Sequence, residues 1–155
     1  SVPYLADVAR LELLRVRAFH TADADPISPE RIARALADPE RLPALRATCH
    51  PSLGVLRSDY AVVSLWAAHQ GYGDLAQINP SVPESALIVR VGLDVQVLAL
   101  PPGGDTLTVS LADGLPLGQA AALALAARED FDLTAHLTLL LRVGALTALV
   151  QPTEA

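Results

Sequence analysis

Two strand-like segments separated by only two residues constrain the fold of this chain more than any other feature. Residues 85–91 and 94–100 are β-branched and alternating, as ALIVR and DVQVLAL show, and a Gly-Leu pair lies between them. Two prolines follow directly and end the second segment, because proline withholds the donor that a strand ladder needs. The sequence therefore predicts an antiparallel hairpin at about residues 85–100.

The opening residues, about 4–20 (YLADVARLELLRVRAFH), predict a helix that is apolar on more than one side. One face carries Leu5, Val8, Ala9, Leu13, Val16 and Phe19. Leu11 and Leu14 point away from that face, so a second surface must cover them. The chain contains no methionine, and the simplest interpretation is a fragment whose first helix joined it to a preceding domain. Leu11 and Leu14 are then the expected contacts to that domain.

The remaining pattern predicts an α+β fold, a mostly antiparallel sheet packed by several helices. Ser28 and a following proline mark the start of a second helix, and Asp132 can cap the last one. Helices are expected at about 29–37, 60–69, 105–112, 117–127 and 133–143, and further strands at 44–49, 53–57 and 146–150. Residues 1–24 are expected to form an interdomain linker helix, and residues 25–155 a single domain.

Composition narrows the classes of function. The net charge is −6 and all 11 basic residues are arginine, so binding to nucleic-acid phosphates is not expected of these residues. No apolar run reaches the roughly 18 residues that span a bilayer, so no membrane partner is expected. A single cysteine rules out an internal disulfide and fits a reducing cytoplasm.

No catalytic or metal-binding pattern stands out, so no catalytic residue, metal or cofactor is predicted. Cys49 and His50 are adjacent on an extended segment, where neighbouring side chains point to opposite faces. The carboxylates at 129, 130 and 132 precede a helix, where they favour its positive dipole end. Glu12, in the middle of the apolar helix face, is expected to form an ion pair rather than to act in catalysis.

The helices at 117–127 and 133–143 have helix-turn-helix spacing. The second offers only His136 and Arg142 as polar groups that could read bases, whereas a recognition helix needs an exposed polar face. A core helix is therefore the favoured interpretation.

Trp66 and the hairpin are the candidates for binding a partner, since an exposed strand edge accepts an extended peptide. The predicted contact residues are Trp66, Arg90, Val95 and Val97. In the alternative interpretation Trp66 belongs to the core, and Arg90 or the flanking prolines protect the edge.

Five segments in order resemble a bacterial family of the HvfC/BufC type, described as "putative DNA-binding domain". They are YLADVARLELLRVRAFHTADA, HPSLGVLRSDYAVVSLWAAHQ, VRVGLDVQVLALPPG, DGLPLGQAAALALA and LLLRVGALTAL. The resemblance covers nearly the whole chain, and it is specific through the ordered series rather than through one motif. It implies a two-domain protein, of which this chain is similar to the linker helix and the α+β C-terminal domain, without the helical N-terminal domain.

The resemblance further implies a non-catalytic partner of a multinuclear iron-dependent oxidase that modifies cysteines of a ribosomally made peptide. The expected function is therefore an accessory module that docks the oxidase and recognises the precursor peptide, with any iron held by the oxidase. The alternative is a DNA-binding transcriptional regulator, with this chain as its dimerisation or effector domain. That alternative would need an Arg-lined face, for which Arg10, Arg15, Arg17 and Arg34 are candidates. A small-molecule enzyme would instead need a deep pocket with converging polar groups.

Overall fold

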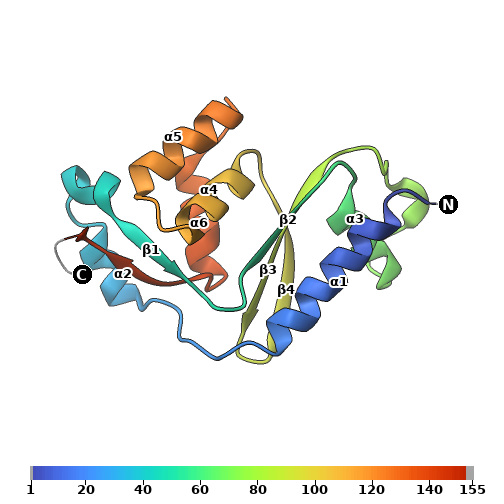
Figure 1. Cartoon of the computed structure of the whole chain (residues 1–155), viewed down its shortest axis with the longest axis horizontal. Helices are drawn as coiled ribbons and strands as arrows, with labels where there is room; N and C mark the ends of the chain where they lie inside the picture. The colour runs from blue at the N-terminus through green and yellow to red at the C-terminus, as the bar shows by residue number, and fades with distance from the viewer. Residues whose placement is uncertain (1, 153–155) are drawn as a thin grey trace. The chain divides into compact units, whose positions relative to one another are not determined.

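The computed structural model describes residues 2–152, and it has an α+β fold whose strands all pair antiparallel (Figure 1). The α-helices are α1 (Leu5–Phe19), α2 (Pro29–Ala35), α3 (Val62–His69), α4 (Gly104–Ala112), α5 (Leu117–Ala127) and α6 (Leu133–Arg142). The strands are β1 (Arg46–Cys49), β2 (Gly54–Ser58), β3 (Glu84–Val91), β4 (Asp94–Leu100) and β5 (Leu146–Val150). Two short 3-10 helices, η1 (Pro39–Ala44) and η2 (Leu75–Gln77), complete the list.

The described residues form two compact units. Unit 1 contains residues 2–21 and 52–100, and unit 2 contains residues 22–51 and 101–152. The opening helix, expected as a linker outside a single domain, is therefore part of a packed unit, and the chain passes between the units three times.

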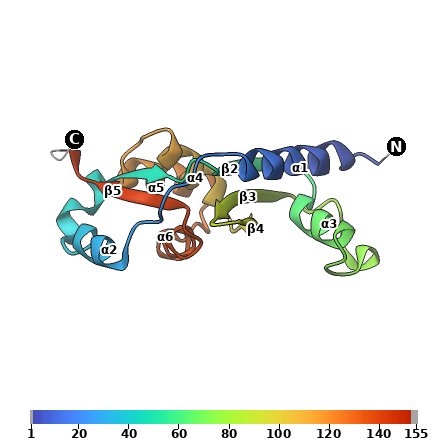
Figure 2. The same ribbon diagram turned by 90° about the horizontal axis from the view of Figure 1, so that it is seen from below.

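Unit 1 is a three-stranded sheet in the order β2-β3-β4. The predicted hairpin is confirmed as β3 and β4, with Val91 opposite Asp94 across the turn and Gly92 at a φ of 60°. Helices α1 and α3 both pack on this sheet, and Figure 2 shows α1 running alongside its strands. The buried core between them consists of Leu11, Ala18, Val62, Ala86 and Ile88.

Helix α3 begins without a cap from its own first residues, because the residue before it is Ala61. Glu84, at the start of β3, takes that role. One of its carboxylate oxygens accepts the backbone N–H groups of Val63 and Ser64, each at 2.9 Å, and the other accepts the Ser64 hydroxyl at 2.6 Å. A negative charge on the first N–H groups of a helix stabilises that helix end, so β3 fixes the start of α3.

Unit 2 is built on the antiparallel pair β1 and β5, in which Arg46 lies opposite Val150. The two extended segments around residues 44–57 were both predicted, but they belong to different sheets, one in each unit. The helix caps follow the sequence: Ser28 accepts the Arg31 N–H at 3.3 Å and Asp132 accepts the Ala135 N–H at 3.0 Å. The short helices η1 and η2 were not predicted.

Helix α1 packs on the sheet of unit 1 through the face of Leu11 and Leu14, which was expected to contact a preceding domain. Leu11 is fully buried, and Leu14 packs against the same core and lies 3.3 Å from the position that a side chain at Gly54 would take. These two residues therefore contact the sheet of unit 1, and the prediction that they meet an absent domain is wrong. The physical reason is that a helix with two apolar faces can bury either one, and the sheet covers the narrower face.

Candidate binding surfaces

Most of the wider apolar face of α1 is exposed, except Val8, which packs against the core of unit 1. Leu13, Val16 and Phe19 expose 68%, 55% and 58% of their surface, and Leu5 at the other end of the helix exposes 48%. Leu13, Val16 and Phe19 follow one another at three-residue spacing and form one strip, and Leu5 lies two turns earlier on the same side, with Ala9 and Glu12 between. We call Leu5, Leu13, Val16 and Phe19 the outer stripe. Large contiguous apolar surface of this kind marks interaction sites in soluble proteins.

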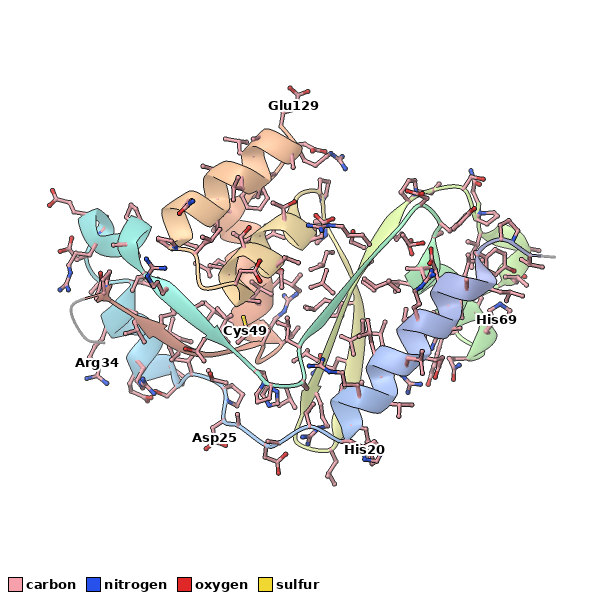
Figure 3. The ribbon with its side chains drawn as sticks, in the orientation of Figure 1. His20, Asp25, Arg34, Cys49, His69 and Glu129 are labelled. Atoms are coloured by element: carbon pink, nitrogen blue, oxygen red, sulfur yellow. The ribbon has the colours of Figure 1, made fainter. Side chains whose placement is uncertain are left out.

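A shallow groove of about 200 Å³ adjoins the C-terminal half of the outer stripe. Its lining comes from α1, through Arg15, Val16, Phe19 and His20, and from Val95 of β4. Figure 3 shows His20 at the end of α1, where its ring stacks edge-on against Phe19 with centroids 5.3 Å apart. The groove therefore joins the outer stripe to strand β4, which pairs with β3 on one side and with no described strand on the other.

Glu12 lies in the middle of the apolar face, between Leu5 and the rest of the outer stripe, and is held by two partners. Its carboxylate pairs with Arg15 at 3.0 Å and accepts the indole N–H of Trp66 from α3. The Arg15 guanidinium also lies over the Trp66 ring, 5.0 Å from its centre, in a cation–π contact. The predicted ion pair of Glu12 is confirmed, and Trp66 packs partly buried against the core of unit 1.

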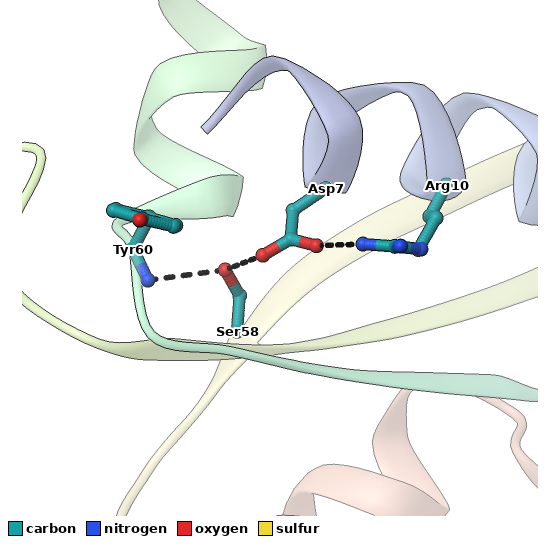
Figure 4. A network of polar contacts seen from close by, with 4 residues as sticks. All are labelled: Asp7, Arg10, Ser58 and Tyr60. Carbon is teal, nitrogen blue, oxygen red and sulfur yellow. Dashed lines mark hydrogen bonds and ion pairs between the residues drawn. The ribbon is translucent and has the colours of Figure 1, made fainter. Parts of the chain in front are cut away.

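A second polar contact fixes the first turn of α1 (Figure 4). The Ser58 hydroxyl at the end of β2 donates to Asp7 at 2.6 Å and accepts the Tyr60 N–H at 3.1 Å. The other oxygen of Asp7 pairs with Arg10. Because Ser58 is buried, this contact joins helix, strand and the loop before α3 at one point.

Arg90, predicted to contact a peptide, instead closes the C-terminal end of α1. It is only 6% exposed. Its Nε donates to the Ala18 carbonyl at 2.9 Å, and its terminal nitrogens donate to Thr21 and Gly92 carbonyls at 2.6 and 2.7 Å. A cation on the last carbonyls of a helix is favourable because those carbonyls lack intrahelical donors. The peptide-contact prediction for Arg90 is therefore wrong.

Val95 and Val97 of β4 are half-buried and pack on the core under α1. Of the four residues predicted to bind a peptide, Trp66, Val95 and Val97 therefore support the surface from beneath, and Val95 alone lines the groove. The sequence did not identify the outer stripe as the exposed face, although its apolar spacing was visible.

Unit 2 contains an apolar groove of about 340 Å³ between η1, α5 and α6. Gly118 lies at its base, where a side chain would come within 2.9 Å of Pro43. Leu36, Leu42, Leu133, Leu137 and Leu141 supply most of the wall. The groove depends on close packing of α5 against η1, which only glycine permits at that position.

The groups considered for metal binding or acid–base chemistry in unit 2 are separate from one another. Burial raises the pKa of the Cys49 thiol from 9.0 to about 11, which keeps it protonated at neutral pH. Asp132 caps α6, and Asp130 pairs with Arg128 at 3.1 Å. Among residues 2–152, no three His, Cys, Asp or Glu side chains gather where they would hold a metal ion.

Of the two polar groups of α6 considered for reading bases, Arg142 is exposed and His136 is not. His136 is buried, its ring nitrogens lie 2.8 and 3.2 Å from the carbonyl oxygens of Asp132 and Pro101, and its ring packs on Phe131. Of the arginines considered for a DNA-binding face, Arg10 and Arg15 are each paired with a carboxylate of α1. Two of the three α1 arginines are thus neutralised.

A scan against protein-family models and a search of curated proteins both found no match for this chain. None of the helices within residues 2–152 combines the length and the apolar character needed to cross a membrane.

Proposed function

We propose that this chain is a non-catalytic accessory module that docks a partner protein through the outer stripe and accepts an extended peptide at the edge of β4. The single observation that carries the proposal is the outer stripe itself. It is a row of large apolar side chains left in water on a helix whose other face is already packed. Exposing such a row costs free energy in the isolated chain, and docking a partner removes that cost.

The polar contacts around α1 support a rigid docking surface. Ser58 holds the first turn of the helix, Glu12 is bonded to Trp66, and Arg90 closes the last turn. A surface that is already ordered loses little conformational entropy when a partner binds. The outer stripe is therefore suited to recognition by a partner whose complementary surface is equally apolar.

The edge of β4 supports the peptide part of the proposal. A strand with one unpaired edge can add an extended peptide through main-chain hydrogen bonds, and side-chain pockets beside the edge supply specificity. The groove lined by Phe19 and Val95 is such a pocket, of a size for one small apolar side chain.

The family resemblance supplies the proposed identities: the partner is a multinuclear iron-dependent oxidase of a bacterial peptide-modification system, and the peptide is its precursor substrate. We propose that this system works in the cytoplasm. The iron and the cysteine chemistry belong to the oxidase, and this chain contributes only binding.

Isothermal titration of the purified chain against an oxidase encoded beside its gene, with and without the precursor peptide, tests the proposal. A complex with a dissociation constant in the micromolar range or below, weakened at least about 10-fold by Val16→Glu, is expected because a buried charge without a partner is costly. Leu125→Glu is the matched control, since Leu125 is 53% exposed on α5 in unit 2.

Three outcomes would contradict the proposal. They are no complex at micromolar concentrations, equal weakening by the control variant, and a gene neighbourhood that encodes no such oxidase. Tight binding of duplex DNA by the chain would favour the regulator alternative instead.

A further inference from the structure

A polar cavity in unit 2 gathers three arginines from two separate elements. The cavity has a volume of about 280 Å³. Arg31 and Arg34 come from α2 and Arg41 from η1, while Leu45 and Leu149 form an apolar floor. Arg31 and Arg34 are three residues apart, so they share one face of the helix, and Figure 3 shows Arg34 extending from α2.

Within the described part of the chain, the three guanidinium groups have no paired carboxylate. Among residues 2–152, no carboxylate lies within ion-pair distance of Arg31, Arg34 or Arg41. Asp38 also lines the cavity, but one of its carboxylate oxygens accepts the Glu40 N–H at 3.0 Å and caps η1. The cavity therefore carries an excess of positive charge in a chain whose net charge is −6.

The position of Arg41 is fixed by the end of β5. Gln151 is buried and its side-chain amide donates to the Arg41 carbonyl at 3.1 Å. This bond holds the backbone of η1 against the end of β5, so the third arginine lines the same cavity as the two of α2. Like charges held close together repel one another, and an anion placed between them removes that repulsion.

We propose that this cavity binds a compact oxyanion that carries at least two negative charges. Guanidinium groups match the planar pairs of oxygens on carboxylates and phosphates and bind them in a bidentate manner. The volume lies near the lower end of small-ligand pockets, which span about 300–1,000 Å³, so a compact ligand fits better than an extended polymer. A phosphate group and a di- or tricarboxylate share this chemistry.

Calorimetric titration of the whole chain with pyrophosphate and with citrate, at low ionic strength, tests the inference. A dissociation constant below about 1 mM is expected for at least one of the two probes. Tighter binding of pyrophosphate would assign a phosphate ligand, and tighter binding of citrate a carboxylate ligand. Arg34→Gln should weaken binding at least about 10-fold, because it removes one bidentate partner without changing the fold.

Arg142→Gln is the matched control, because Arg142 is an exposed arginine of the same unit outside the cavity. It should leave the affinity within about twofold. The inference is overturned if neither probe binds at about 10 mM. It is also overturned if both variants weaken binding equally, or if duplex DNA binds more tightly and competes with both probes. Circular dichroism of Arg34→Gln separates a lost site from a lost fold, and Arg41→Gln repeats the test from η1.

Discussion

The two units use their arginines in opposite ways. In unit 1, Arg90 is buried and its guanidinium donates to main-chain carbonyls at the end of α1 and in the β3–β4 turn. In unit 2, Arg31, Arg34 and Arg41 are exposed and line a cavity, and none of them forms an ion pair with a carboxylate of residues 2–152. The arginine side chain stabilises the fold in unit 1, whereas in unit 2 its charge is available to a ligand. Burial and the local hydrogen-bond partners determine which of the two roles an arginine has.

Helix α1 repeats this contrast with apolar side chains. Leu11 fills the core of unit 1, whereas Leu13, two residues later, is mostly exposed. The residue type is the same, so any difference between them comes from the surroundings. Matched substitutions on the two faces of α1, and in the two units, therefore test whether the surroundings decide the role of each side chain.

The largest effect is expected at Leu11. Leu11→Ala removes a fully buried side chain and leaves a cavity under α1, so it should lower the free energy of unfolding by about 4 kcal/mol. Leu13→Ala should change it by less than about 1 kcal/mol, because Leu13 is already exposed. Urea unfolding of both variants measures the difference, and equal losses would show that the outer stripe is packed.

Arg90 gives the next largest effect. Arg90→Met keeps the apolar stem but leaves the carbonyls of Ala18, Thr21 and Gly92 without this donor, so a loss of about 3 kcal/mol is expected. Arg34→Gln should change the free energy of unfolding by less than about 0.5 kcal/mol. If both variants lost a similar free energy of unfolding, the claim that Arg90 stabilises the fold and Arg34 does not would be refuted.

Ser58 tests a smaller contact in unit 1. Ser58→Ala removes the hydroxyl that links Asp7 to the Tyr60 N–H, and a loss of about 1–2 kcal/mol is expected because a charged acceptor loses its partner. Asp7→Asn keeps a hydrogen-bonding group at this position, so it should lower the free energy of unfolding by less than Ser58→Ala does. Thermal unfolding of the two variants compares their stability. An unchanged melting temperature for Ser58→Ala would show that this contact does not stabilise the chain.

At neutral pH, where the thiol is protonated in both states, Cys49 gives the smallest effect on stability. Its pKa is about 11 in the folded chain and 9.0 as the ordinary value, so the folded state holds the proton more tightly. The contribution is fully present below pH 9 and is lost as the pH rises toward 11. At pH 8, iodoacetamide should alkylate Cys49 about 100-fold more slowly in the folded than in the urea-unfolded chain, following the thiolate fraction. Equal rates would contradict the burial of the thiol.

Local signals in the sequence were sufficient to predict most of the helices and strands. The alternating segments around Gly92 predicted the hairpin, and Ser28 and Asp132 predicted two helix starts that the structure confirms. These features depend on residues close together in the chain. The pairing of β1 with β5 joins segments about 100 residues apart, and no local pattern specifies it.

The binding surfaces were harder to predict for the same reason. Apolar spacing identified two faces of α1, but only the sheet and the contacts of Asp7 and Glu12 decide which face is buried. Likewise, Arg31 and Arg34 could be placed on one helix face from their spacing. Their convergence with Arg41 depends on the bond between Gln151 and η1, which is a tertiary contact.

The proposed docking surface is tested by hydrogen–deuterium exchange of the chain alone and in complex with the proposed oxidase and precursor peptide. We expect slower exchange on binding in peptides that cover α1 and β4, with α5 unchanged as the internal reference. Slower exchange confined to unit 2, with α1 and β4 unchanged, would contradict the claim that the outer stripe and the β4 edge form the binding surface.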